Sequence, residues 1–313
     1  MKKMLIAVLA ALMLLTACAG AQAVNVYALK GPTGIGMVGL MDDEDYSFTL
    51  AGAPDEIVAA IASGSADIAA CPTNLAATLY KKTNGGVQIL ALNTLGVLHI
   101  VTSDAAIDSI DDLAGRTVYA TGQASVPEYV IRYILEANGL TDSVELVFVA
   151  EHSELATMMA AGKVDIGILP EPHVTSVLMQ NADMRAALDV TVLFEDAARA
   201  NGSEDMVLSM GCVIVRKDFA QEHPEQVAAF MADYEASVTM VNADPAAASE
   251  LVQAHGVMPK AAVAKRAIPN CHIVFVAGEE MRAQVEPLYE VLFAANPAAI
   301  GGAMPDDAFY YVP

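Results

Sequence analysis

The chain has 313 residues, with 38 Asp and Glu against 16 Lys and Arg and a formal net charge of −22 at pH 7. Contacts to nucleic acid phosphates are built on Lys and Arg, so this charge balance argues against a nucleic acid partner. A chain of this length forms one large or two moderate domains, each with its own hydrophobic core.

The first 18 residues have the pattern of an export signal. Lys2 and Lys3 precede an uncharged apolar run over 4–15, which is too short to cross about 30 Å of hydrocarbon. The run ends in Leu-Thr-Ala-Cys18, which resembles the bacterial lipobox, so we expect residues 1–17 to be a signal peptide. Lipid on the Cys18 thiol would then anchor the protein to the membrane, outside the cytoplasm, in a periplasm or on the cell surface. An ordinary signal peptide with an incidental cysteine is the alternative.

Cysteine and histidine spacing gives no metal signature. The three remaining cysteines form no C-x-x-C pair, and we expect them to be buried small side chains: Cys71, Cys212 and Cys271. Five histidines are scattered without the spacing of metal ligands: His99, His152, His223, His255 and His272. We therefore expect neither a metal nor a cofactor.

Short apolar strands alternate with helical stretches after the signal, which predicts an α/β fold with largely parallel strands. The predicted strands are 24–29, 47–51, 67–70, 87–92, 116–120, 144–149 and 165–169. The predicted helices are 34–41, 54–63, 126–138 and 153–161.

A helix-turn-strand unit occurs twice, at an offset of 98 residues. The matching pairs are Glu56 and Glu154, Gly64 and Gly162, Asp67 and Asp165, and Pro72 and Pro170. Each copy has the pattern of a helix ended by a glycine, followed by an acidic turn residue and a short buried strand. A period this long is not that of a solenoid, so the repeat predicts two similar lobes.

The duplicated unit, the linker over 109–118 (Ser-Ile-Asp-Asp-Leu-Ala-Gly-Arg-Thr-Val) and the lipobox together resemble periplasmic-binding-protein type II domains. Within these domains the chain is most similar to the nitrate, sulfonate, taurine and thiamine-precursor group. The resemblance implies two lobes that close on a small molecule, and a monomer that delivers its ligand to the permease and ATPase of an ABC importer. Lobe I would be 24–103 plus 210–313, lobe II 104–209, and the crossover strands 97–102 and 207–215.

Small ligands of open parallel sheets bind beyond the carboxyl ends of strands, where helices begin. Four segments meet that description: 31–34, 72–74, 121–125 and 170–173. The candidate ligand contacts are Gly31, Thr33, Thr73, Asn74, Asn93, Gln123, Ser125, Glu171 and His173. Turn and capping chemistry is the competing explanation for several of them, including a capping box between Ser125 and Glu128 and a helix-dipole role for Glu171.

The ligand class is less well defined. None of the four segments contains Arg or Lys, and Lys30 alone borders them, which favours a neutral or cationic heteroaromatic or amine-bearing compound. An anion such as nitrate or a sulfonate, held by helix ends, is the alternative. Some enzymes share this fold, including pyrimidine-precursor synthases and menaquinone-pathway dehydratases. The export signal and the lack of any Ser-His-Asp, Cys-His or paired-carboxylate arrangement argue against an enzyme.

Overall fold

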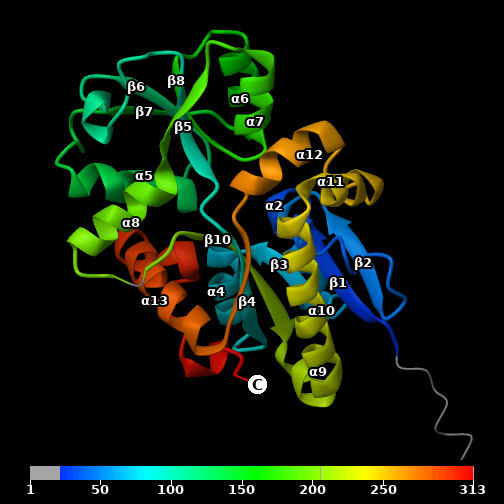
Figure 1. Ribbon diagram of the computed structural model, residues 1–313. Helices are drawn as coiled ribbons and strands as arrows, with labels where there is room; N and C mark the ends of the chain where they lie inside the picture. Colours follow the sequence, from blue (N-terminus) through cyan, green and yellow to red (C-terminus); the bar gives the residue numbers. More distant parts are fainter. Residues whose placement is uncertain (1–21, 205, 313) are drawn as a thin grey trace, which may run out of the picture.

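The computed structural model describes residues 22–204 and 206–312, which form two lobes, each built on one β-sheet (Figure 1). The α/β, two-lobed architecture predicted from the alternation of strands and helices is confirmed. The predicted signal over 1–17 and Cys18 lie outside the described residues, so both stay predictions. Within the described ranges, no helix combines the length and the apolar character needed to cross a membrane.

The first sheet has six strands in the order β11-β4-β10-β3-β1-β2. Their bounds are β1 Val24–Leu29, β2 Tyr46–Ala51, β3 Ile68–Pro72, β4 Val87–Leu95, β10 Ser209–Arg216 and β11 Ile273–Ala277. β1, β2 and β3 run parallel, whereas β10 is antiparallel to both of its neighbours, β3 and β4. The strand that returns from the second lobe is therefore inserted in the middle of the first sheet.

The second sheet has five strands in the order β7-β6-β8-β5-β9. Their bounds are β5 Leu98–Thr102, β6 Thr117–Ala120, β7 Glu145–Phe148, β8 Ile166–Pro170 and β9 Arg185–Asp189. β6, β7 and β8 are parallel, and β5 pairs antiparallel with β8 and β9. The predicted crossover strand 97–102 thus pairs within the second sheet, while the lobe boundaries themselves stay a prediction.

Helices cover both faces of each sheet (Figure 1). In the first lobe these are α2 Pro32–Ile35, α3 Pro54–Ser63, α4 Thr73–Lys82, α9 Lys217–Glu222, α10 Pro224–Ala243, α11 Pro245–Ala254, α12 Ala261–Ala267 and α13 Gly278–Ala295. In the second they are α5 Val126–Ala137, α6 His152–Ala160, α7 His173–Gln180 and α8 Val190–Ala200. Short 3₁₀ turns span Ile110–Leu113, Ile268–Asn270, Pro297–Ile300 and Asp307–Phe309.

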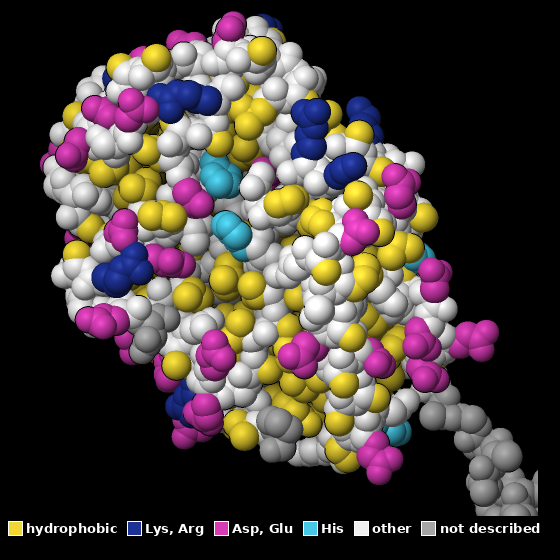
Figure 2. Space-filling view, viewed as in Figure 1, with side chains coloured by type: hydrophobic (Ala, Val, Ile, Leu, Met, Phe, Trp, Pro, Cys, Tyr) yellow, Lys and Arg dark blue, Asp and Glu magenta, His cyan; other side chains and the backbone are white. Residues whose placement is uncertain are grey.

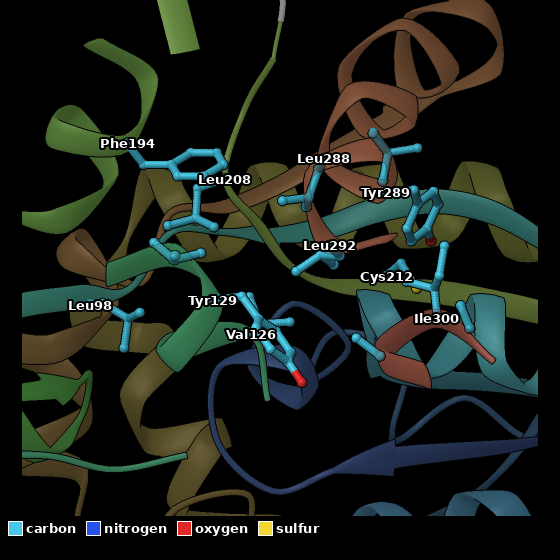
Figure 3. Packing of buried hydrophobic residues seen from close by; sticks show 14 of the residues in the cluster. Leu98, Val126, Tyr129, Phe194, Leu208, Cys212, Leu288, Tyr289, Leu292 and Ile300 are labelled. Atoms are coloured by element: carbon cyan, nitrogen blue, oxygen red, sulfur yellow. The ribbon is translucent and has the colours of Figure 1, made fainter. Parts of the chain in front are cut away.

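One apolar core continues from the first lobe into the second. Figure 3 shows Tyr129 of α5 and Phe194 of α8 in the same cluster as Leu288 and Leu292 of α13. All four side chains are buried, at 8% exposure or less. The two lobes therefore share apolar packing on the side of the molecule where α5, α8 and α13 meet.

Cys71, Cys212 and Cys271 are buried, as the sequence predicts. Cys71 on β3 lies directly opposite Cys212 on β10, and burial raises the pKa of the Cys212 thiol. Both are free thiols and serve as small apolar side chains in the centre of the first sheet.

The predicted helix over 34–41 is wrong, because the helix that forms there is the four-residue α2. The remainder of that segment is turn, and it packs closely against α10. Ser237 of α10 donates to the Gly36 carbonyl at 2.6 Å and accepts from the Gly39 N–H at 3.0 Å. A Cβ on Gly39 would stand 2.6 Å from the Ser237 hydroxyl. The turn over 36–41 is thus held by its contact with α10, which lies far along the chain, and the helix does not continue.

The duplicated unit is present as α3-β3-α4 and α6-β8-α7, but its acidic residue differs between the copies. Asp67 is 7% exposed and accepts hydrogen bonds from the Asn25 backbone N–H at 2.9 Å and from Arg216 at 3.1 Å. Asp165 is exposed and has a 3.5 Å contact to Ser103. The same residue type thus joins two strands in one lobe and faces solvent in the other.

We expect Asp67→Ala to lower the free energy of unfolding by about 1–3 kcal/mol, since it leaves the buried Asn25 N–H without its acceptor and the half-buried Arg216 with only its exposed partner Asp218. Asp165→Ala, the matched position of the second copy, should change it by no more than about 0.5 kcal/mol. Urea unfolding of the two variants measures both values. Equal losses would contradict the structural role assigned to Asp67.

Candidate functional site

A cavity of about 560 Å³ lies between the lobes, at the carboxyl ends of β1, β3 and β8. This is the place that the strand-end argument predicts. Its polar wall residues are Lys30, Thr33, Thr94, His152, Glu171, His173, Ser176 and Lys260. Its apolar wall includes Pro72, Val97, Pro170, Met210, Val257, Met258 and Val263. The surface between the lobes in Figure 2 exposes histidine side chains among apolar ones.

Gly31 and Thr33, both candidates from sequence, belong to the cavity wall. Gly31 has a φ of 97°, which favours glycine, and it begins α2. Asn93, another candidate, is not part of the wall; it is 1% exposed and its side-chain amide donates to the Thr33 carbonyl at 3.1 Å. A Cβ on Gly211 would stand 2.5 Å from the Asn93 oxygen, so glycine is needed there too. Asn93 therefore positions the loop that carries Thr33.

Thr73 and Asn74 follow Pro72 of the wall but do not belong to it. Thr73 is fully buried, and its hydroxyl lies 2.8 Å from that of Ser209 on β10. Asn74 donates to the Ala299 carbonyl at 3.3 Å. Both side chains hold α4 against neighbouring segments of the first lobe.

Gln123 and Ser125 also lie outside the cavity wall. Gln123 is exposed. The predicted capping box at Ser125 is wrong: its hydroxyl donates to the Gly122 carbonyl at 2.6 Å and makes no hydrogen bond to the N–H groups of α5. Glu128 instead accepts from the Ala124 N–H at 2.7 Å, because the loop turns tightly before the helix. The loop is thus closed by its own hydrogen bonds.

Glu171 lies in the wall and is only 2% exposed. Its carboxylate accepts from the Thr175 N–H at 3.0 Å and the Thr175 hydroxyl at 2.9 Å, which satisfies the first turn of α7. Asn270 of the first lobe donates to it at 3.4 Å. Burial raises the pKa of the Glu171 carboxyl. The hydrogen bonds act in the opposite direction but do not cancel the effect of burial. Glu171 therefore caps α7 and also joins the two lobes.

His173 faces the cavity beside a histidine that the sequence analysis did not select. The rings of His173 and His152 have centroids 5.6 Å apart. Burial, together with the neighbouring His152, lowers the pKa of His173 to about 4, and burial lowers the pKa of His152 as well. Burial therefore favours the neutral form of both rings. The two rings come together because α6 and α7 pack against each other in the second lobe.

Lys260 is the second wall residue that sequence reasoning missed. It belongs to the segment between α11 and α12, which no strand-end argument selects. Lys30 and Lys260 are both exposed, and neither has a carboxylate within 4 Å among the described residues. Lys30 alone borders the four predicted segments, and the structure adds a second lysine to the wall from outside them.

The family described as "ABC transporter, phosphonate, periplasmic substrate-binding protein" matches residues 43–262, more than half of the chain. The chain belongs to this family. It is thus a substrate-binding protein that acts outside the cytoplasm, binds a small ligand and works with the permease and ATPase of an ABC importer. Family and structural neighbours are binding proteins, so the enzyme alternative is not supported.

Solved structures show the same fold. An ABC transporter protein from Parabacteroides distasonis has a TM-score of 0.79 and 20% identity, over 93% of this chain and 99% of that one. The periplasmic aliphatic sulphonate binding protein SsuA from Escherichia coli has a TM-score of 0.73 and 14% identity, over 94% of this chain and 93% of that one. The alkanesulfonate-binding protein SsuA from Xanthomonas axonopodis pv. citri, bound to MOPS, has a TM-score of 0.62 and 16% identity, over 94% of this chain and 98% of that one. No curated protein matches the sequence.

The lowered pKa of His173 makes stability depend on pH. Between the ordinary histidine value of 6.5 and about 4, the unfolded chain binds a proton at this residue that the folded chain does not bind. The folded protein should therefore lose stability as the pH falls through this window, and His173→Gln should lose less. Thermal unfolding of the metal-free protein at several pH values between 4 and 6.5 measures the difference. His223→Gln, at an exposed histidine between α9 and α10, is the control; equal slopes for wild type and His173→Gln would contradict the assignment.

Proposed function

We propose that the protein captures a small organic anion, of the phosphonate or sulfonate class, that carries an apolar body. The observation behind this proposal is the pair Lys30 and Lys260 at the cavity wall, neither of them in a salt bridge among the described residues. Two lysines without a carboxylate within 4 Å favour a ligand of negative charge, although the Glu171 carboxylate belongs to the same wall. Most of the remaining wall is apolar, which suits an alkyl or aryl group better than a bare inorganic ion.

The size of the cavity supports the same proposal. About 560 Å³ is within the usual range of roughly 300–1,000 Å³ for small-molecule sites. The family description names phosphonate, and two similar structures are named as sulfonate-binding proteins. Nitrate alone would leave most of this volume to water.

A carboxylate in the cavity wall would suit an amine-bearing ligand, and Glu171 is the carboxylate that lies there. Its carboxylate oxygens accept hydrogen bonds from Thr175 and Asn270, so little of its acceptor capacity is left for a ligand. This finding favours an organic anion over an amine-bearing or heteroaromatic ligand.

We also propose that a lipid on the Cys18 thiol holds the protein at the membrane, as a monomer next to its permease.

The decisive measurement is calorimetric titration of the purified protein with alkyl phosphonates, alkanesulfonates, phosphate, nitrate and amine-bearing heterocycles. We expect an organic anion to bind, and Lys260→Gln to weaken it by about 2- to 5-fold at low salt, since an exposed ion pair contributes about 0.2–1 kcal/mol. The difference should shrink as added salt screens the charge.

Lys265→Gln is the matched control, because Lys265 is an exposed lysine of α12 that is not part of the cavity wall. It should leave the affinity unchanged. Binding of heterocyclic amines with no binding of organic anions would overturn the proposed ligand class. Equal effects of the two lysine substitutions would remove Lys260 from the site.

A further inference from the structure

The pairing of His152 and His173 is not needed to hold an organic anion. The two residues begin separate helices, α6 and α7, and both belong to the cavity wall. Their ring centroids are 5.6 Å apart and the ring planes meet at 41°. No salt bridge involves either ring among the described residues. The arrangement therefore calls for its own explanation.

The separation of the rings is that of two imidazoles on one metal ion. With metal–nitrogen distances of about 2.0–2.1 Å and a tetrahedral angle, two bound imidazole rings have their centres about 5–6 Å apart. The observed 5.6 Å falls within that range. The distance between the rings is therefore compatible with one ion bound to both of them.

His152 is already oriented as a metal ligand would be. Its Nδ1 is hydrogen-bonded to the hydroxyl of Thr121, a residue that is 1% exposed. When Nδ1 carries the proton and donates it to this hydroxyl, Nε2 has a free lone pair on the side of the ring away from Thr121. A hydrogen bond to the other ring nitrogen is the usual way in which proteins fix metal-binding histidines.

His173 has no hydrogen-bond partner within the described ranges, so its ring nitrogens remain available. Metal binding requires the neutral imidazole, and protons compete for the same lone pair.

We propose that His152 and His173 together coordinate one divalent transition metal ion of the zinc type in the wall of the cavity. Nowhere in 22–204 or 206–312 do three or more His, Cys, Asp or Glu side chains come together as a metal site, so the proposed site would have these two imidazoles as its protein ligands. The other positions face the cavity and are open to water or to oxygen atoms of a bound molecule. Glu171 in the same wall favours a cation there, whereas Lys30 and Lys260 oppose it. This inference does not depend on the ligand class proposed above.

The test is a titration of the chelator-treated protein with Co²⁺, followed by its visible d–d absorption, and with Zn²⁺ by calorimetry. No organic anion is present, so failure here and failure of the anion proposal are separate results. We expect one bound ion per chain. His152→Asn and His173→Gln should each weaken binding by at least about tenfold, because each removes one of two protein ligands.

His152→Asn is chosen because its side-chain amide can keep the hydrogen bond to Thr121 while the Nε2 ligand is lost. His223→Gln should bind as the wild type does, and thermal unfolding without metal checks that each variant is folded. Absence of metal binding to the wild type would overturn the proposal. Binding that survives in both cavity variants would also overturn it, since the ion would then lie elsewhere.

Discussion

The architecture depends on the insertion of β10 between β3 and β4. This strand returns from the second lobe and pairs antiparallel with both neighbours. Along the described residues, the chain leaves the first sheet between β4 and β5 and returns to it between β9 and β10. Because β10 is central, its residues are under tight packing constraints, as Gly211 beside Asn93 and Thr33 illustrates. One strand therefore contacts the loop that carries Thr33 and places Met210 in the cavity wall. The same strand carries the chain back from the second lobe.

The sequence predicted the fold well where local pattern and tertiary packing agree. Helix α3 has the predicted bounds, and strands such as β1 and β6 agree to within one residue, since alternating apolar residues and a terminal glycine define them locally. The helix predicted over 34–41 is wrong because the backbone of this segment packs on Ser237, and no local sequence pattern indicates that contact. Membership of the substrate-binding family was also predicted, from the order and spacing of the duplicated units.

The candidate site was predicted in part. Gly31, Thr33, Glu171 and His173 belong to the cavity wall, because the carboxyl ends of parallel strands meet at one edge. Thr73, Asn93 and Ser125 instead hydrogen-bond to their own surroundings, and sequence position cannot tell a side chain that faces the cavity from one that faces the backbone. Lys260 and His152 reach the wall from the connection before α12 and from the start of α6, so only the packed structure brings them there.

The shared apolar core described above makes the two sides of the molecule unequal. Where α5, α8 and α13 meet, separating the lobes would expose buried side chains such as Phe194 and Leu292 to water. On the cavity side, the lobes meet through polar contacts such as that of Asn270 with Glu171, which water can replace at little cost. The two lobes are therefore held together by different kinds of contact on the two sides of the molecule. On the cavity side α7 and α12 touch, so any opening there would part these two helices and give a solute access to the cavity wall.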